Sequence, residues 1–148
     1  MNQTETLTAQ NASQFREKIR QLEKKLGMLS QHHCGSCEPV TLSQCHALVE
    51  IGRNDSLSLK QLSEILLLDA STTSRVVDQL VKKGYVLRTS SKTDRRGIEI
   101  TLTNQGNEYY TSIESEMNQL FLNRFKKIPA ESREIVMESI ELLIAAFS

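Results

Sequence analysis

The sequence has no tryptophan, only two prolines and only six glycines among its 148 residues. So little proline and glycine excludes collagen-like and low-complexity chains. The longest apolar runs, residues 65–68 and 142–147, fall far short of the about 18 residues that a membrane-spanning helix needs. The first residues are polar and lack a basic flank followed by an apolar stretch. We therefore expect no signal peptide and a cytoplasmic protein.

Net charge is also lacking, because 18 basic and 18 acidic side chains cancel. The cancellation is uneven along the chain. Residues 71–97 contain seven basic and two acidic side chains, whereas residues 104–148 carry a net charge of −3. Such a basic segment is either a solvated face or a surface for a polyanion such as nucleic acid. The overall charge of zero therefore does not exclude a DNA-binding protein.

Apolar residues recur at helical spacing near both ends of the chain. A stripe that steps by four and three residues predicts a helix over about 10–31, and it consists of Phe15, Ile19, Leu22, Leu26 and Leu29. Similar stripes follow Gly106 and Pro129. Because these helices are long relative to the small centre of the chain, we expect them to pack against a second copy of the chain.

The central part predicts three short helices over about 42–53, 58–67 and 71–83. Thr41-Leu42-Ser43-Gln44 and Ser58-Leu59-Lys60-Gln61 both match the capping-box pattern at a helix start. The last two helices are joined by a break at residues 68–70, which is typical of a helix-turn-helix. We expect their shared apolar core to consist of Leu62, Ile65, Leu66, Val76, Val77 and Leu80.

Two stretches of strand-forming residues follow, at 85–89 and 98–102, with a polar, basic loop between them. A hairpin directly after a helix-turn-helix forms a wing. We therefore predict a mainly α fold with a small β-hairpin wing, namely a winged helix-turn-helix with long N- and C-terminal dimerisation helices.

The third central helix begins with four hydroxyl residues and an arginine. Hydroxyls and helix-start amides bind phosphate, and an arginine can contact guanine through two parallel hydrogen bonds. The alternative is a simple helix cap. We predict that the DNA-contacting residues here are Ser71, Thr72, Thr73, Ser74 and Arg75, with Thr72, Thr73 and Arg75 facing the DNA. Lys82 and Lys83 are expected to meet phosphate or only solvent.

The loop of the hairpin carries Lys92 and the triplet Asp94-Arg95-Arg96. An arginine at a hairpin tip can enter the narrow minor groove of A·T-rich DNA, where the negative potential is strongest. A neighbouring aspartate can fix such an arginine by a charge-assisted hydrogen bond. We predict DNA contacts from Lys92, Arg95 and Arg96, the alternative being a surface loop with a chance run of charges.

These motifs together resemble the MarR (multiple antibiotic resistance regulator) family of winged-helix proteins. The segments that carry the resemblance are residues 59–64, residues 71–84, Asp94-Arg95-Arg96 and residues 102–106. The resemblance implies a homodimeric, non-enzymatic transcription regulator, usually a repressor, that binds a pseudo-palindromic operator of double-stranded DNA. It also implies effector pockets between the dimerisation helices and the DNA-binding lobes.

The same resemblance divides the chain into three parts. Residues 1–34 would form the N-terminal dimerisation helix and tail, and residues 35–106 the winged helix-turn-helix domain. Residues 107–148 would form the C-terminal dimerisation helices.

All three cysteines and all three histidines lie within residues 32–46. Cys34 and Cys37 have a spacing used for metals and for dithiol redox chemistry, and Cys45 and His46 lie at the start of the next predicted helix. We predict a metal, metalloid or thiol-oxidation sensor at Cys34, Cys37, Cys45 and His46, with a soft metal ion as the cofactor if one is bound. The MarR family includes zinc sensors and thiol-oxidation sensors to which this cluster is similar.

Several alternatives to this sensor remain open at this point. The regulator could respond to a small organic ligand, or the cysteines could have no sensing role. A redox protein based on Cys34 and Cys37 is disfavoured because no βαβ pattern surrounds them. A winged helix that binds only proteins is disfavoured by the basic set of Arg75, Arg95 and Arg96.

Overall fold

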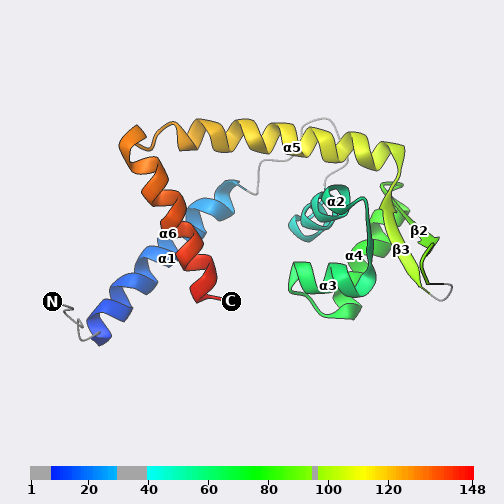
Figure 1. Ribbon diagram of the computed structural model, residues 1–148, viewed down its shortest axis with the longest axis horizontal. Helices are drawn as coiled ribbons and strands as arrows, with labels where there is room; N and C mark the ends of the chain where they lie inside the picture. Colours follow the sequence, from blue (N-terminus) through cyan, green and yellow to red (C-terminus); the bar gives the residue numbers. More distant parts are fainter. Residues whose placement is uncertain (1–7, 30–39, 95–96) are drawn as a thin grey trace. The chain divides into compact units, whose positions relative to one another are not determined.

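The computed structural model describes residues 8–29, 40–94 and 97–148, and it divides into two compact units, Met1–Leu42 and Ser43–Ser148. The first unit contains helix α1 (Ala9–Leu29) (Figure 1). Thr8 and Asn11 close its N-terminus reciprocally, since the Thr8 amide donates to Asn11 Oδ1 and the Asn11 amide donates to Thr8 Oγ1. Three apolar residues of α1 remain 45–47% exposed, namely Phe15, Leu22 and Leu26.

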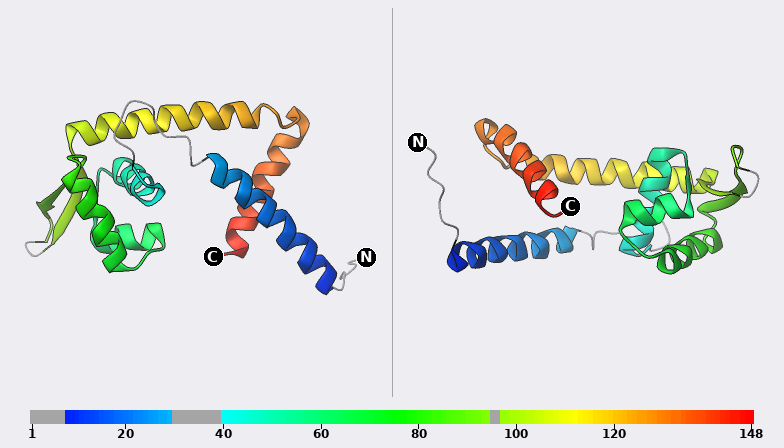
Figure 2. Two further views of the ribbon diagram at one scale, coloured as in Figure 1. Left: turned by 180° about the vertical axis from the view of Figure 1, so that it is seen from behind. Right: turned by 60° about the horizontal axis from the view of Figure 1, so that its bottom comes forward.

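The second unit contains the predicted winged helix-turn-helix (Figures 1 and 2). Its helices are α2 (Leu42–Asn54), α3 (Leu59–Leu66) and α4 (Ala70–Lys82), followed by strands β2 (Val86–Ser90) and β3 (Ile98–Leu102). The largest fully buried side chains come from all of these elements and are Leu48, Ile51, Leu62, Val77, Leu80, Val86 and Ile100, together with Thr73. The predicted fold class is thus confirmed for this unit.

One element was not predicted. Strand β1 (Ser56–Ser58) pairs antiparallel with β3, so that the hairpin becomes a three-stranded sheet in the order β1-β3-β2. Leu57 of β1 lies opposite Ile100, and Arg88 of β2 lies opposite the same residue on the other side. Leu57, Ile100 and Arg88 therefore share one face of the sheet.

Helix α3 begins as the sequence predicts. Ser58 is its N-cap and forms a complete capping box with Gln61. The helix ends at Leu67, whose φ of 55° is left-handed. The expectation that Ile65 lies in the core is wrong: it sits in the last turn of this eight-residue helix and is 42% exposed. Leu62, Val76, Val77 and Leu80 are buried as expected.

After the sheet come helix α5 (Asn104–Phe125), the short 3-10 helix η1 (Ala130–Ser132) and helix α6 (Arg133–Ala146). Thr103 caps α5 by accepting from the Gly106 amide and donating to the carbonyl of Gly84. Several large apolar side chains of α6 are exposed, among them Ile135, Leu142 and Ile144 at 63–73%. None of the helices in the described part of the chain combines the length and the apolar composition that crossing a membrane requires.

Candidate nucleic-acid interface

Asp69 caps the helix that the sequence predicts to contact DNA. Its carboxylate accepts from the Thr72 amide at 2.9 Å and from the hydroxyls of Thr72 and Ser71 at 2.6 and 2.8 Å. The hydrogen bonds from Thr72 and Ser71 hold the pKa of Asp69 well below its ordinary value of 3.8. The hydroxyls of Ser71 and Thr72 therefore donate to Asp69, which leaves their lone pairs as acceptors for a partner.

The prediction that Thr73 faces DNA is wrong. Thr73 has no exposed surface, and its hydroxyl donates to the carbonyl of Asp69 at 2.9 Å. Because the Asp69 carbonyl accepts this hydrogen bond, the hydroxyl of Thr73 can be buried without losing a partner. Thr73 is therefore a core residue, as Val76 and Val77 are. Four consecutive hydroxyl residues carry no apolar period, which is why the sequence did not show which of them turns inward.

The exposed face of α4 carries Ser71, Arg75, Asp78 and Lys82. These residues are spaced by four, three and four positions, so they form one stripe along the helix. We call this set the exposed α4 stripe. Its members are polar, and two of the four are cationic. A helix face of this composition can enter the major groove of DNA, where Arg75 has the donor geometry to contact a guanine.

A residue that the sequence interpretation missed joins this stripe to the wing. Arg88 of β2 places Nη2 2.7 Å from Asp78 Oδ1 and 3.4 Å from Ser74 Oγ. The Asp78 carboxylate in the middle of the stripe is thereby paired with a guanidinium group. The same ion pair connects β2, the first strand of the hairpin, to α4. The strand register accounts for this contact, because Arg88 stands on the same face of the sheet as the buried Ile100.

The described part of the wing loop is organised around the Ser91 hydroxyl. This oxygen accepts from the amides of Thr93 and Asp94 at 3.2 Å each and donates to Glu99 Oε1 at 2.8 Å. The Gly97 amide donates to the carbonyl of Asp94 at 2.9 Å. Lys92 is exposed on this loop, as its predicted role requires. The predicted contacts Arg95 and Arg96 lie outside the described residues.

The structure covers only half of the predicted sensor. Cys45 is partly exposed and His46 is exposed in the first turns of α2. Cys34 and Cys37 lie outside the described residues. Among residues 8–29, 40–94 and 97–148, no three side chains of His, Cys, Asp or Glu are placed to hold one metal ion. The described residues therefore offer only Cys45 and His46 for sensing chemistry.

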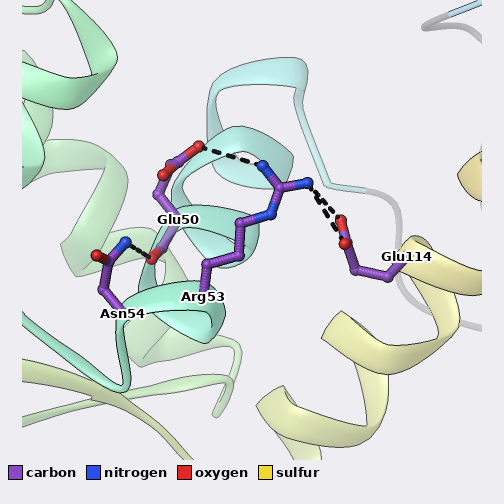
Figure 3. Close-up of polar contacts among 4 residues, drawn as sticks. All are labelled: Glu50, Arg53, Asn54 and Glu114. Carbon is purple, nitrogen blue, oxygen red and sulfur yellow. Dashed lines mark hydrogen bonds and ion pairs between the residues drawn. The ribbon is translucent and has the colours of Figure 1, made fainter.

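The far end of α2 is joined to α5 by a polar bridge. Arg53 contacts Glu114 of α5 at 3.3 Å and Glu50 of α2 at 3.9 Å (Figure 3). Beside it, a Cβ on Gly52 would overlap the ring of Tyr110, so glycine allows the two helices to approach closely here. Arg53 and Gly52 thus hold α2 against α5, the helix that leads out of the sheet.

Helix, turn, helix and a three-stranded wing together define a winged helix-turn-helix domain. A model of the MarR family matches residues 40–98 of this chain. The HTH-type transcriptional regulator SarZ of Staphylococcus epidermidis is 32% identical over 89 residues, and SarZ of Staphylococcus aureus is 33% identical over the same length. Each match covers 60% of this chain and 60% of the relative's length. The winged helix-turn-helix segment of the chain, residues 40–98, is thus similar to the MarR family.

Solved structures with the same fold cover nearly the whole chain. FabT of Streptococcus pneumoniae, crystallised in complex with DNA, has a TM-score of 0.82 at 17% identity and covers 92% of this chain and 96% of its own. A MarR family protein from Bacillus stearothermophilus has a TM-score of 0.81 at 18% identity, with 96% and 99% covered. At these identities the similarity establishes the fold.

Proposed function

We propose that the protein is a transcription regulator that binds double-stranded DNA through the exposed α4 stripe and the wing. The observation that carries this proposal is the Arg88 contact, which fixes a cationic helix face and a basic hairpin as one surface. In the account we propose, Arg75 contacts a base edge in the major groove, with Ser71, Thr72 and Ser74 beside it. Lys92, Arg95 and Arg96 contact the adjacent minor groove or its phosphates.

The regulator is proposed to act as a homodimer. Exposed apolar residues on α1 and α6 support this proposal. Monomeric proteins rarely expose large apolar surfaces to solvent. Residues 1–34 and 107–148 would supply the dimer contacts, and residues 35–106 the DNA contacts. Two α4 helices related by a twofold axis would then bind half-sites about 34 Å apart, one turn of the duplex, in a pseudo-palindromic operator.

The proposed regulation is repression that an effector relieves. Cys45 and His46, together with Cys34 and Cys37, would sense a thiol oxidant or bind a soft metal or metalloid ion. Cys45 supports this because it is a partly exposed free cysteine in the first turn of α2. A small organic effector is the second candidate. The two candidates differ in whether the response requires the thiols.

The experiment begins with selection of bound fragments from random duplex DNA, followed by fluorescence anisotropy on the selected site. We expect enrichment of a twofold-related sequence and an affinity that falls steeply with salt, as phosphate contacts require. Arg75→Ala should weaken binding about tenfold, which corresponds to about 1.4 kcal/mol. Failure to enrich any sequence at low salt, with the protein folded, would contradict the proposal.

A further inference from the structure

A buried amide links the start of α2 to helix α4. The polar side chains buried in the described ranges are Gln44, 3% exposed, and Thr73. Gln44 stands in the first turn of α2, and its Nε2 donates to Oε1 of Gln79 at 2.5 Å, across 35 positions of sequence. Burying an amide is unfavourable unless it keeps such a partner. The two helices are thus held in a defined position by a hydrogen bond.

This contact is more sensitive to displacement than the apolar contacts around it. A hydrogen bond requires both distance and direction, whereas apolar contacts allow small sliding movements. If the first turn of α2 shifts, Gln44 either loses its hydrogen bond to Gln79 or draws Gln79 with it. Gln79 lies one turn beyond Arg75 and next to Asp78, so a shift of Gln79 reaches the exposed α4 stripe.

We propose that Gln44 is a positioning residue for DNA binding, which sets the placement of α4 through Gln79. The inference rests on the proposed function and adds the route by which α2 acts on the DNA-contacting surface. Cys45 follows Gln44 directly in the same turn, so a change that displaces this turn alters the DNA-contacting helix through Gln44.

The test is a double-mutant cycle on the full chain with the selected DNA site. Gln44→Leu and Gln79→Leu are each expected to weaken DNA binding at least about fivefold. The double variant should bind no more weakly than the weaker single variant, because both changes remove the same contact. Asn54→Leu serves as a matched control, since its amide donates across an exposed turn of the same helix α2 to the carbonyl of Glu50, and it should bind like the wild type.

Two measurements separate an effect on the placement of α4 from an effect on folding. One is thermal unfolding, and the other is the fraction of the protein that binds when DNA is in excess. A merely structural role would lower the melting temperature and leave the affinity of the folded protein unchanged, which would overturn the inference. Gln79 is exposed, so Gln79→Leu provides a folded variant even where Gln44→Leu unfolds. Wild-type affinity for Gln79→Leu, or additive losses in the cycle, would also overturn it. Absence of DNA binding by the wild type itself would instead contradict the proposed function.

Discussion

Arg88 Nη2 and Asp78 Oδ1 lie 2.7 Å apart and join the wing to the exposed α4 stripe. The two side chains are 37% and 54% exposed, so the ion pair contributes at most about 1 kcal/mol to folding. Its importance is therefore expected in DNA binding, where an unpaired Asp78 would face the phosphates. An exposed ion pair of this kind can be removed without unfolding the domain.

Arg88→Ala should weaken DNA binding about tenfold or more and change the free energy of unfolding by less than about 1 kcal/mol. The reason is that the variant both frees the Asp78 carboxylate and releases the first strand of the wing from α4. Arg53→Ala is the matched control, because it also removes an exposed, ion-paired cation but acts between α2 and α5. Equal losses of affinity in both variants would show that only net charge matters.

The cap of α4 predicts a particular pH dependence of stability. The folded-state pKa of Asp69 is lower than its unfolded value near 3.8, so the cap stabilises the fold fully above that value. This contribution is lost as the pH falls below about 3.8 toward the lower folded-state pKa. Asp69→Ala should therefore lower the melting temperature at pH 7 by about 2–4 °C.

The difference in melting temperature between Asp69→Ala and the wild type should shrink as the pH falls below about 3.8. Calorimetry across pH 2–7 measures this difference. Asp69→Asn is the control, since an amide also caps helices but does not titrate in this range. A gap between wild type and Asp69→Ala that stays constant down to pH 2 would show that the carboxylate does not act as described.

Gly106 allows α5 to start directly against the sheet. A Cβ at this position would overlap the carbonyl oxygen of Tyr85. Gly106→Ala should therefore destabilise the fold by about 2 kcal/mol or more. Gly27→Ala on α1 meets nothing within 4 Å and should instead stabilise its helix by about 0.5–1 kcal/mol. Denaturant titrations that rank the two variants the other way would contradict the close approach of α5 to Tyr85.

The sensor proposal predicts that thiol chemistry alters DNA binding. Treatment of the wild type with diamide, or titration with Zn²⁺, should lower its affinity for the selected site. The variant in which Cys34, Cys37 and Cys45 are all replaced by Ser should bind DNA normally and lose that response. If the triple variant responds like the wild type, the thiols are not the sensor and an organic effector becomes the better candidate.

Much of the fold followed from the sequence because it depends on local periodicity. The helical stripes, the turn after Leu67 and the capping box at Ser58 are properties of short segments, and the structure confirms them. Strand β1 was missed because three residues are too few to show an alternating pattern. Its pairing with β3 is set by tertiary contacts rather than by its own composition.

The candidate interface was less predictable because it depends on contacts between distant segments. Which hydroxyl of residues 71–74 turns inward is decided by how α4 rotates onto the core, and this buries Thr73. The Arg88 and Gln44 contacts depend on strand register and on helix placement across 10 and 35 positions of sequence. A basic residue inside a strand-forming run, such as Arg88, was the available signal for the first of these.

The most direct measurement is a hydroxyl-radical footprint of the full chain on the selected DNA site, with wild type and Arg75→Ala compared at equal concentration. We expect two protected stretches of backbone sugars about 10–10.5 base pairs apart, centre to centre, which flank the two major-groove half-sites, with further protected positions in the adjacent minor grooves. Arg75→Ala should remove this protection at concentrations where the wild type protects fully. A single protected segment, or protection that Arg75→Ala leaves unchanged, would contradict a dimer that contacts DNA through the exposed α4 stripe and the wing.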